Sequence, residues 1–250
     1  MSGHNKWSSI KHKKGATDAK RGKIFTRIVK EIIIAAKSGG GDPEMNPRLR
    51  TAINTAKEAN MPKDNIDRAV KRGTGEIEGV AYDEITYEGY GYNGVGIVVD
   101  VMTDNKNRSV AEIRHAFSKF GGNMAESGSV SWNFEPKGYF QVPSDGLDED
   151  EFMMQALEAG AEDINPIDEF FEVFTSPHEF HTVLGNMEKA GFPVMNAELT
   201  RIPKTTINAD DVAAKLMRLI DFLEDLDDVQ KVYANYEISD AVMEQLEKEQ

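Results

Sequence analysis

The stretch FFEVFTSPHEFHTVLGNMEKAGFPVMNAELTRI, residues 170–202, decides the fold class. Its first six residues are rich in Phe, Val and Thr and predict a strand. Ser176 and Glu179 then have the spacing of a capping box, with Pro177 at the first position of a helix. Residues 194–202 return to a strand pattern. The stretch is therefore a strand, a helix and a strand in succession.

The residues before this stretch predict another strand, helix and strand in the same order. YFQV at 139–142 predicts a strand, a helix follows from about Asp148, and a further strand ends near Ile164. The acidic run 148–151 suits a solvated helix N-terminus, because negative charge there interacts favourably with the helix dipole. The complete order is β-α-β-β-α-β, the ferredoxin-like unit, which we expect over residues 137–203.

The segments on either side of this unit depend on each other. YDEITYEGY and GVGIVVDVMT, residues 82–103 with their glycine turn, predict a β-hairpin. Ser109 and Glu112 predict a helix start, and GSVSWNF at 128–134 predicts another strand. After the unit, a helix through Leu216 and a strand at 229–238 have no sheet of their own. We therefore expect residues 79–136 and 204–250 to form one split α+β domain that contains the ferredoxin-like unit as an insertion.

Residues 1–78 predict a helical bundle. A long helix starts at Thr17 or Asp18 and ends at the glycines 39–41, a second begins with Pro47, and a third begins near Pro62 and is stopped by Gly73. The overall prediction is an α+β multidomain protein, with a helical bundle followed by two α+β domains.

The composition indicates a folded chain in a reducing compartment. The 250 residues are 40% hydrophobic and 29% charged, and none is cysteine, which excludes disulfides and thiolate chemistry. No apolar run approaches the roughly 20 residues of a membrane span, and no secretory signal is recognisable. We expect a cytoplasmic protein without a membrane partner.

The charges are strongly segregated along the chain. Residues 1–75 hold 17 Lys and Arg against 7 Asp and Glu, a net charge of +10, whereas residues 76–250 hold 12 against 36, a net charge of −24. Such asymmetry is typical of a chain in which one part meets a polyanion. The alternative is that the basic segment docks on the acidic remainder.

Basic side chains interleaved with ring side chains near the N-terminus suggest nucleic-acid binding, because Lys and Arg neutralise phosphates and rings can stack on unpaired bases. Trp7 has two readings, since it either stacks on a base or packs on its own domain. The candidates in this segment are Lys6, Trp7, Lys11, His12, Lys13, Lys14, Lys20, Arg21, Lys23 and Arg27. Arg108, Arg114 and Lys119 are either secondary phosphate contacts or ion-pair partners of nearby acids.

Other motifs give no case for catalysis, a metal or a cofactor. Gly89, Gly91 and Gly94 match the pattern GxGxxG, but a Val-rich strand follows where a dinucleotide site needs a helix, so we interpret them as a hairpin turn. His178 and His181 lack an evident third ligand and are expected to be a surface pair. No spacing of Ser, His and acid marks a hydrolase, and we expect a protein that is not an enzyme.

Five segments resemble the YebC family of bacterial proteins, which is related to a mitochondrial translational activator of cytochrome c oxidase. They are GHNKWSSIKHKKGATDAKRGKIFTRIVKEI (3–32), PKDNIDRAVKRGTGE (62–76), YEGYG (87–91), TDNKNRSVAEIRHAFSKFGGN (103–123) and GSVSWNFEPKG (128–138). The resemblance implies three domains, with the third inserted into the second. Tyr92-Asn93 stands where the family pattern has a proline-glycine turn. No mitochondrial extension precedes the first segment, so we expect a bacterial protein.

The resemblance implies two functions. Some members are DNA-binding transcriptional regulators, and others are ribosome-associated factors that relieve stalling on proline-rich nascent chains. It extends the nucleic-acid-binding role to Lys63, Arg68, Lys71 and Arg72. We expect a regulator of gene expression that binds duplex DNA, with ribosomal RNA and the ribosome as the alternative partners. The oligomeric state is not predicted.

Overall fold

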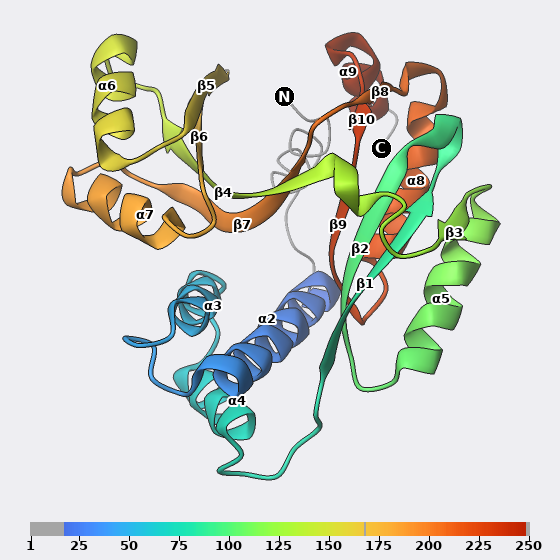
Figure 1. Ribbon diagram of the computed structural model, residues 1–250, viewed down its shortest axis with the longest axis horizontal. Helices are drawn as coiled ribbons and strands as arrows, with labels where there is room; N and C mark the ends of the chain where they lie inside the picture. Colours follow the sequence, from blue (N-terminus) through green and yellow to red (C-terminus); the bar gives the residue numbers. More distant parts are fainter. Residues whose placement is uncertain (1–17, 168, 249–250) are drawn as a thin grey trace. The chain divides into compact units, whose positions relative to one another are not determined.

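The computed structural model describes the backbone of residues 18–167 and 169–248, and the side chains of residues 22–167 and 169–246 (Figure 1). The chain forms two compact units, one of residues 1–133 and 205–250 and the other of residues 134–204. Within the described part of the chain, none of the helices combines the length and the apolar character that crossing a membrane requires.

The unit of residues 134–204 has the ferredoxin-like arrangement. Its elements are β4 (Phe134–Pro143), α6 (Glu149–Ala159), β5 (Asp163–Ile167), β6 (Phe170–Thr175), α7 (Phe180–Lys189) and β7 (Met195–Pro203). The strands pair antiparallel in the order β5-β6-β4-β7. Phe140 and Val173 of the sheet pack with Phe152 of α6 and Phe180 of α7 in one core. Asp148 caps α6 as predicted, because its carboxylate accepts a hydrogen bond of 3.0 Å from the backbone N–H of Glu151.

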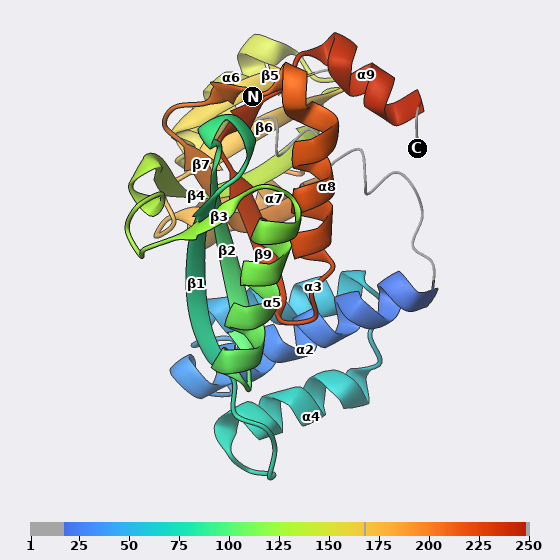
Figure 2. The same ribbon diagram turned by 90° about the vertical axis from the view of Figure 1, so that its right-hand side faces the viewer.

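The larger unit contains a second antiparallel sheet. β1 (Asp83–Tyr90), β2 (Gly96–Thr103), β3 (Asn123–Ala125) and β9 (Val229–Ala234) lie in the order β3-β1-β2-β9. The helices α5 (Lys106–Lys119) and α8 (Ala213–Glu224) pack on it through a shared core (Figure 2). β9 pairs with β2, so the C-terminal segment joins the sheet of the hairpin. The strand predicted over 229–238 is divided in the structure into β9 and the short β10 (Tyr236–Glu237), which pairs with β8 (Ile207–Asn208). The sequence pattern missed β8 and the helix α9 (Asp240–Lys248).

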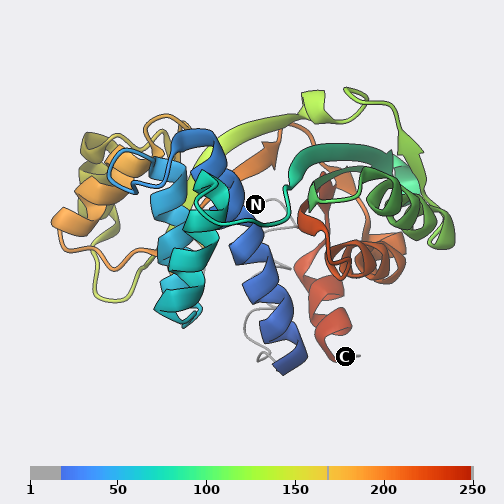
Figure 3. The same cartoon turned by 90° about the horizontal axis from the view of Figure 1, so that it is seen from below.

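Among the residues that the structure describes, the N-terminal part of the same unit has three helices, α2 (Asp18–Gly39), α3 (Pro47–Glu58) and α4 (Lys63–Thr74). α2 packs against both of the others (Figure 3). Asn46 fixes the turn between α2 and α3, since its side chain accepts from the N–H of Leu49 and donates to the carbonyl of Ala35. The α+β multidomain fold is therefore confirmed. The division of the larger unit at residue 78 stays a prediction.

The predicted end of the third helix was wrong. Gly73 lies inside α4, and a Cβ there would come within 2.5 Å of the carbonyl oxygen of Ile33 and 2.6 Å of the Cβ of Ala36. The glycine therefore lets α4 lie against α2. The helix ends at Gly75, whose φ of +80° is the left-handed conformation that glycine adopts without strain.

Three other predicted boundaries and one predicted strand were also wrong. α5 starts at Lys106 with Asn105 as its cap, and α7 starts at Phe180, after a turn in which Ser176 accepts from Glu179. The strand expected to end near Ile164 continues to Ile167. Residues 128–133 of the predicted strand 128–134 are not a strand, because their backbone turns around the side chain of Glu88, and only Phe134 is a strand residue, as the first of β4.

Candidate nucleic-acid interface

Several predicted binding residues lie outside the described part of the structure. The whole of residues 1–17 does, and the side chains of residues 18–21 do too. This places outside it Lys6, Trp7, Lys11, His12, Lys13, Lys14, Lys20 and Arg21. The remaining candidates fall into three groups, on α4, on α2 and, for the secondary contacts, on α5.

The cations of α4 face solvent. Lys63, Arg68, Lys71 and Arg72, here called the α4 cations, are all exposed, while Ile66 and Ala69 of the same helix are buried. Arg68, Lys71 and Arg72 fall within two turns at spacings of three and four residues, which places them on one side of the helix. Within the described side chains, none of the α4 cations is in an ion pair. Asp64 and Asp67 reduce but do not cancel their charge.

The cations of α2, in contrast, contact other residues of the protein. Lys23 donates to the backbone carbonyl of Asp225 at 2.9 Å and lies 3.4 Å from its carboxylate. Arg27 donates to the carbonyl of Glu224. Burial lowers the pKa of Arg27, against the opposing effect of Glu224 and Asp225. These two residues thus dock on the acidic C-terminal end of α8, which is the alternative that the charge pattern left open.

A buried charge cluster also stabilises the contact between α2 and the residues that follow α8. Lys30 is 5% exposed and Asp228 is 4% exposed. The ammonium of Lys30 lies 2.8 Å from the Asp228 carboxylate and also donates to the carbonyls of Met102 and Asp227. The second carboxylate oxygen of Asp228 accepts from Thr103, Arg108 and Ser109. Burial acts to raise the pKa of Asp228, but the hydrogen bonds from Lys30, Arg108 and Ser109 outweigh it and hold that pKa well below its usual range.

The three candidates for secondary phosphate contacts also differ in their environments. Arg108 donates to Asp228 at 2.6 Å and to Asp104 at 2.8 Å, and these hydrogen bonds raise its pKa. It therefore makes the ion pairs that formed the alternative reading. Arg114 and Lys119 are exposed, and the ammonium of Lys119 lies 4.4 Å from the centre of the Phe222 ring.

The sequence reasoning did not single out the exposed Trp132 or the buried Glu88, whose carboxylate holds the loop before it. Glu88 is 3% exposed and accepts hydrogen bonds from the backbone of residues 128–131, and Trp132 at the end of this loop is 66% exposed. A tryptophan in a run of Ser, Gly and Asn was the signal in the sequence, but the strand prediction concealed it.

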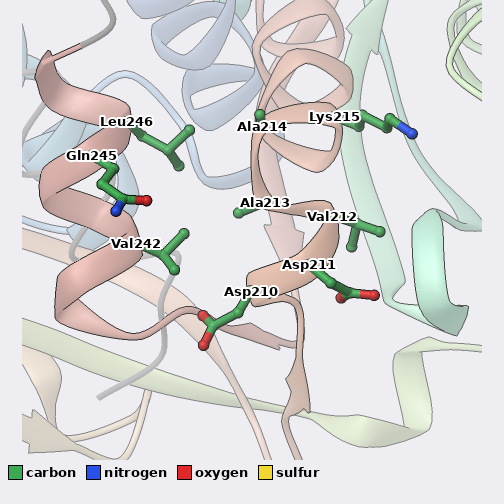
Figure 4. A pocket seen from close by; sticks show the side chains of 9 residues that line it. All are labelled: Asp210, Asp211, Val212, Ala213, Ala214, Lys215, Val242, Gln245 and Leu246. Atoms are coloured by element: carbon green, nitrogen blue, oxygen red, sulfur yellow. The ribbon is translucent and has the colours of Figure 1, made fainter.

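An open hollow of about 250 Å³ lies between α8 and α9 (Figure 4). Val242 and Leu246 of α9 line one side of it, and Val212 and Ala213 line the other. Asp210 at its rim accepts a hydrogen bond of 2.7 Å from the N–H of Ser239, and this bond lowers its pKa. The described residues contain no group of three or more His, Asp or Glu that could hold a metal ion.

Comparison with known proteins gives consistent matches. The model of the TACO1/YebC protein N-terminal domain matches residues 5–76, and that of the TACO1/YebC second and third domain matches residues 82–236. A "Probable transcriptional regulatory protein" of Persephonella marina is 57% identical over 98% of this chain and 100% of that protein. A protein of Geobacter sulfurreducens with the same description is 56% identical over 98% and 100%. The crystal structure of a conserved hypothetical protein from Aquifex aeolicus has a TM-score of 0.81 and 49% identity, and the match covers 89% of this chain and 93% of that one.

Proposed function

The chain belongs to the TACO1/YebC family, and we propose that it regulates gene expression by binding DNA through its N-terminal helices. The names of full-length relatives support the regulatory part of this proposal, since they are described as probable transcriptional regulatory proteins. The nucleic-acid part rests on the α4 cations.

The observation that carries the proposal is the different environment of the two groups of cations. Lys23, Arg27 and Lys30 of α2 are used within the protein, so they are not available to a ligand without breaking those contacts. The α4 cations are exposed and form no ion pair among the described side chains. Exposed Arg and Lys on a helix bind nucleic acid by neutralising phosphates and releasing counterions.

The acidic remainder restricts where a polyanion can bind. Residues 76–250 have a net charge of −24, which repels phosphates from most of that surface. Binding through the basic segment therefore leaves the rest of the chain free to contact other components of the gene-expression machinery.

The test is the salt dependence of binding to a fluorescein-labelled duplex, followed by fluorescence anisotropy. Arg68→Gln, Lys71→Gln and Arg72→Gln are combined in one variant. The matched control combines Lys189→Gln, Lys204→Gln and Lys215→Gln, which removes the same charge from exposed positions outside the N-terminal helices. Each lost phosphate contact reduces the slope of log K against log salt by about 0.9, so the α4 variant loses up to about 3 in slope. Equal effects of the two variants would contradict the proposal.

Phosphate contacts do not distinguish DNA from RNA, so the α4 cations fit ribosomal RNA as well. The translation-factor alternative is tested by competition between ribosomes and duplex promoter DNA for the purified protein, at a salt concentration of about 0.15 M, where loose phosphate binding is partly screened. Retention on ribosomes against excess DNA would replace the transcriptional assignment. Transfer to the DNA would support it.

A further inference from the structure

The packing of α4 on α2 determines which of its side chains face outward. Ile66 and Ala69 are buried, and Gly73 lies against the backbone of α2. These positions are three and four residues apart, so they lie on one side of α4, the side toward α2 (Figure 2). The opposite side, here called the outer strip, consists of four exposed charged residues, Asp64, Asp67, Arg68 and Lys71.

The outer strip contains both acids and cations, and they are not paired with each other. Asp64 and Arg68 are four residues apart, with the acid first, which is the arrangement that favours an ion pair on a helix surface. Asp67 and Lys71 have the same spacing. Yet the ion pairs among the described side chains include neither of these two pairs. The carboxylates of the strip are therefore available as hydrogen-bond acceptors, and its cations as donors.

The two remaining cations of α4 flank the outer strip. Lys63 and Arg72 are nine residues apart, about two and a half helical turns, so they lie on opposite edges of the strip. The side chain of Arg72 lies against Gly79 in the segment after α4, where an added Cβ would come within 3.1 Å of its Cγ and Cδ atoms. Across the helix, a cation is followed by the mixed strip and then by a second cation.

Phosphate binding alone does not account for the acids of the strip. A helix that contacts only phosphates is weakened by every exposed carboxylate, because like charges repel. Asp64 is in the first turn, where it interacts favourably with the helix dipole, but Asp67 is in the second turn, where that effect has declined. Base edges differ from phosphates, since the major groove presents acceptors on guanine and a donor on cytosine. A strip with both donors and acceptors is complementary to base edges.

We propose that α4 lies in the major groove of duplex DNA and recognises base pairs through its outer strip. In this arrangement Arg68 donates two hydrogen bonds to guanine O6 and N7, and Asp67 accepts one from the amino group of cytosine. Lys63 and Arg72 contact the phosphates on the two sides of the groove. A helix with side chains is about 10–12 Å wide, and the major groove of B-DNA is about 12 Å wide.

This inference rests on the proposed function and names its ligand as duplex DNA with a preferred sequence. The major groove of an A-form RNA helix is deep and narrow, and side chains cannot contact its base edges. Duplex RNA is therefore not a ligand for the outer strip.

The test is selection from a pool of duplex DNA that has about 20 random base pairs between fixed ends. The full-length chain is incubated with the pool at about 0.15 M salt, where loose phosphate binding is partly screened, and the bound duplexes are sequenced. We expect enrichment of one short motif that contains guanine. A bidentate contact discriminates against the wrong base by roughly 5- to 150-fold.

Two variants separate base recognition from phosphate binding. Arg68→Lys keeps the charge but loses the planar fork, so the preference for one guanine should disappear. The slope of log K against log salt should stay unchanged, because the number of charges is unchanged. Asp67→Asn should change the preference at a second base pair, whereas with phosphate contacts alone it would raise the affinity for all sequences equally. The matched control is Arg218→Lys, at an exposed position of α8, and should leave the motif unchanged.

The outcomes distinguish this inference from the proposed function. Circular dichroism first establishes that each variant is folded, as the exposure of these side chains leads us to expect. Binding of the pool without an enriched motif, or a motif that is the same for Arg68→Lys, would overturn base recognition and leave the α4 cations as phosphate contacts. Absence of binding to duplex DNA, with retention of ribosomal RNA, would overturn both.

Discussion

Removing the charge of Asp228 should destabilise the larger unit by about 3 kcal/mol. In Asp228→Asn, one oxygen still accepts from Lys30, but an N–H₂ group replaces the oxygen that accepts from Thr103, Arg108 and Ser109. Breaking one partner of a buried ion pair costs about 3–5 kcal/mol. Lys30 keeps its hydrogen bonds to two backbone carbonyls, which places the expected loss at the lower end of that range.

The matched control is Asp225→Asn. Its partner Lys23 makes an ion pair in which the two side chains are 42% and 74% exposed, so the loss should stay below about 1 kcal/mol. The assay is urea unfolding of the wild type and both variants, followed by circular dichroism at pH 7. A loss for Asp228→Asn no larger than that for Asp225→Asn would refute the assignment of stability to the buried cluster.

A pH series adds an independent check. The pKa of Asp228 in the folded protein lies below its ordinary value of 3.8, so the unfolded chain takes up a proton first as the pH falls. Its stabilising contribution is therefore complete above about pH 5 and is lost as the pH falls through 3.8 toward the folded-state pKa. The difference in stability between wild type and Asp228→Asn should be constant from about pH 5 to 8 and narrow below that range. A difference independent of pH would show that ionised Asp228 is not its source.

Three further substitutions test other parts of the structure. Gly73→Ala should lower the free energy of unfolding by about 1–3 kcal/mol, because the added Cβ forces α4 away from α2. Gly22→Ala is the control and should not destabilise the helix, because the space around Gly22 is open. Thermal unfolding compares the two variants. Glu88→Gln replaces one of the two oxygens that accept from the 128–131 backbone with an N–H₂ group and should cost about 1–3 kcal/mol; it should also shift the emission of Trp132 in the Trp7→Phe background. Burial raises the pKa of Glu172 above 4.5, so stability of the smaller unit should fall as the pH rises through that raised pKa; Glu172→Gln should remove this dependence in a series of urea midpoints.

Local signals in the sequence were sufficient for most elements. The N-terminal position of Pro47, the cap at Asp148 and the alternation of residues 82–103 each depend on neighbours within a few residues, and the structure has the element at each place. Strand counting also placed the strand from Val229 beside the hairpin, because a lone strand has no partner for its backbone hydrogen bonds.

Signals that depend on distant residues were read wrongly. Gly73 reads as a helix stop in the sequence, but it is a contact point with Ile33 and Ala36, forty residues away in the chain. Ser109 reads as a cap, but its hydroxyl donates to Asp228. The stretch 128–134 reads as a strand, but the carboxylate of Glu88 takes up its N–H groups. In each case a tertiary contact determined the local conformation.

The candidate interface shows the same division. The sequence by itself determined that the N-terminal segment is basic and that the remainder is acidic, because net charge is a sum over residues and does not depend on their positions in space. Only the tertiary structure decided which cations are available, since Lys23, Arg27, Lys30 and the α4 cations have the same charge in the sequence. Folding brings the first three against Glu224, Asp225 and Asp228, about two hundred residues later in the chain, and leaves the α4 cations in water. The availability of a charge depends on its neighbours in space, and no local pattern in the sequence specifies those neighbours.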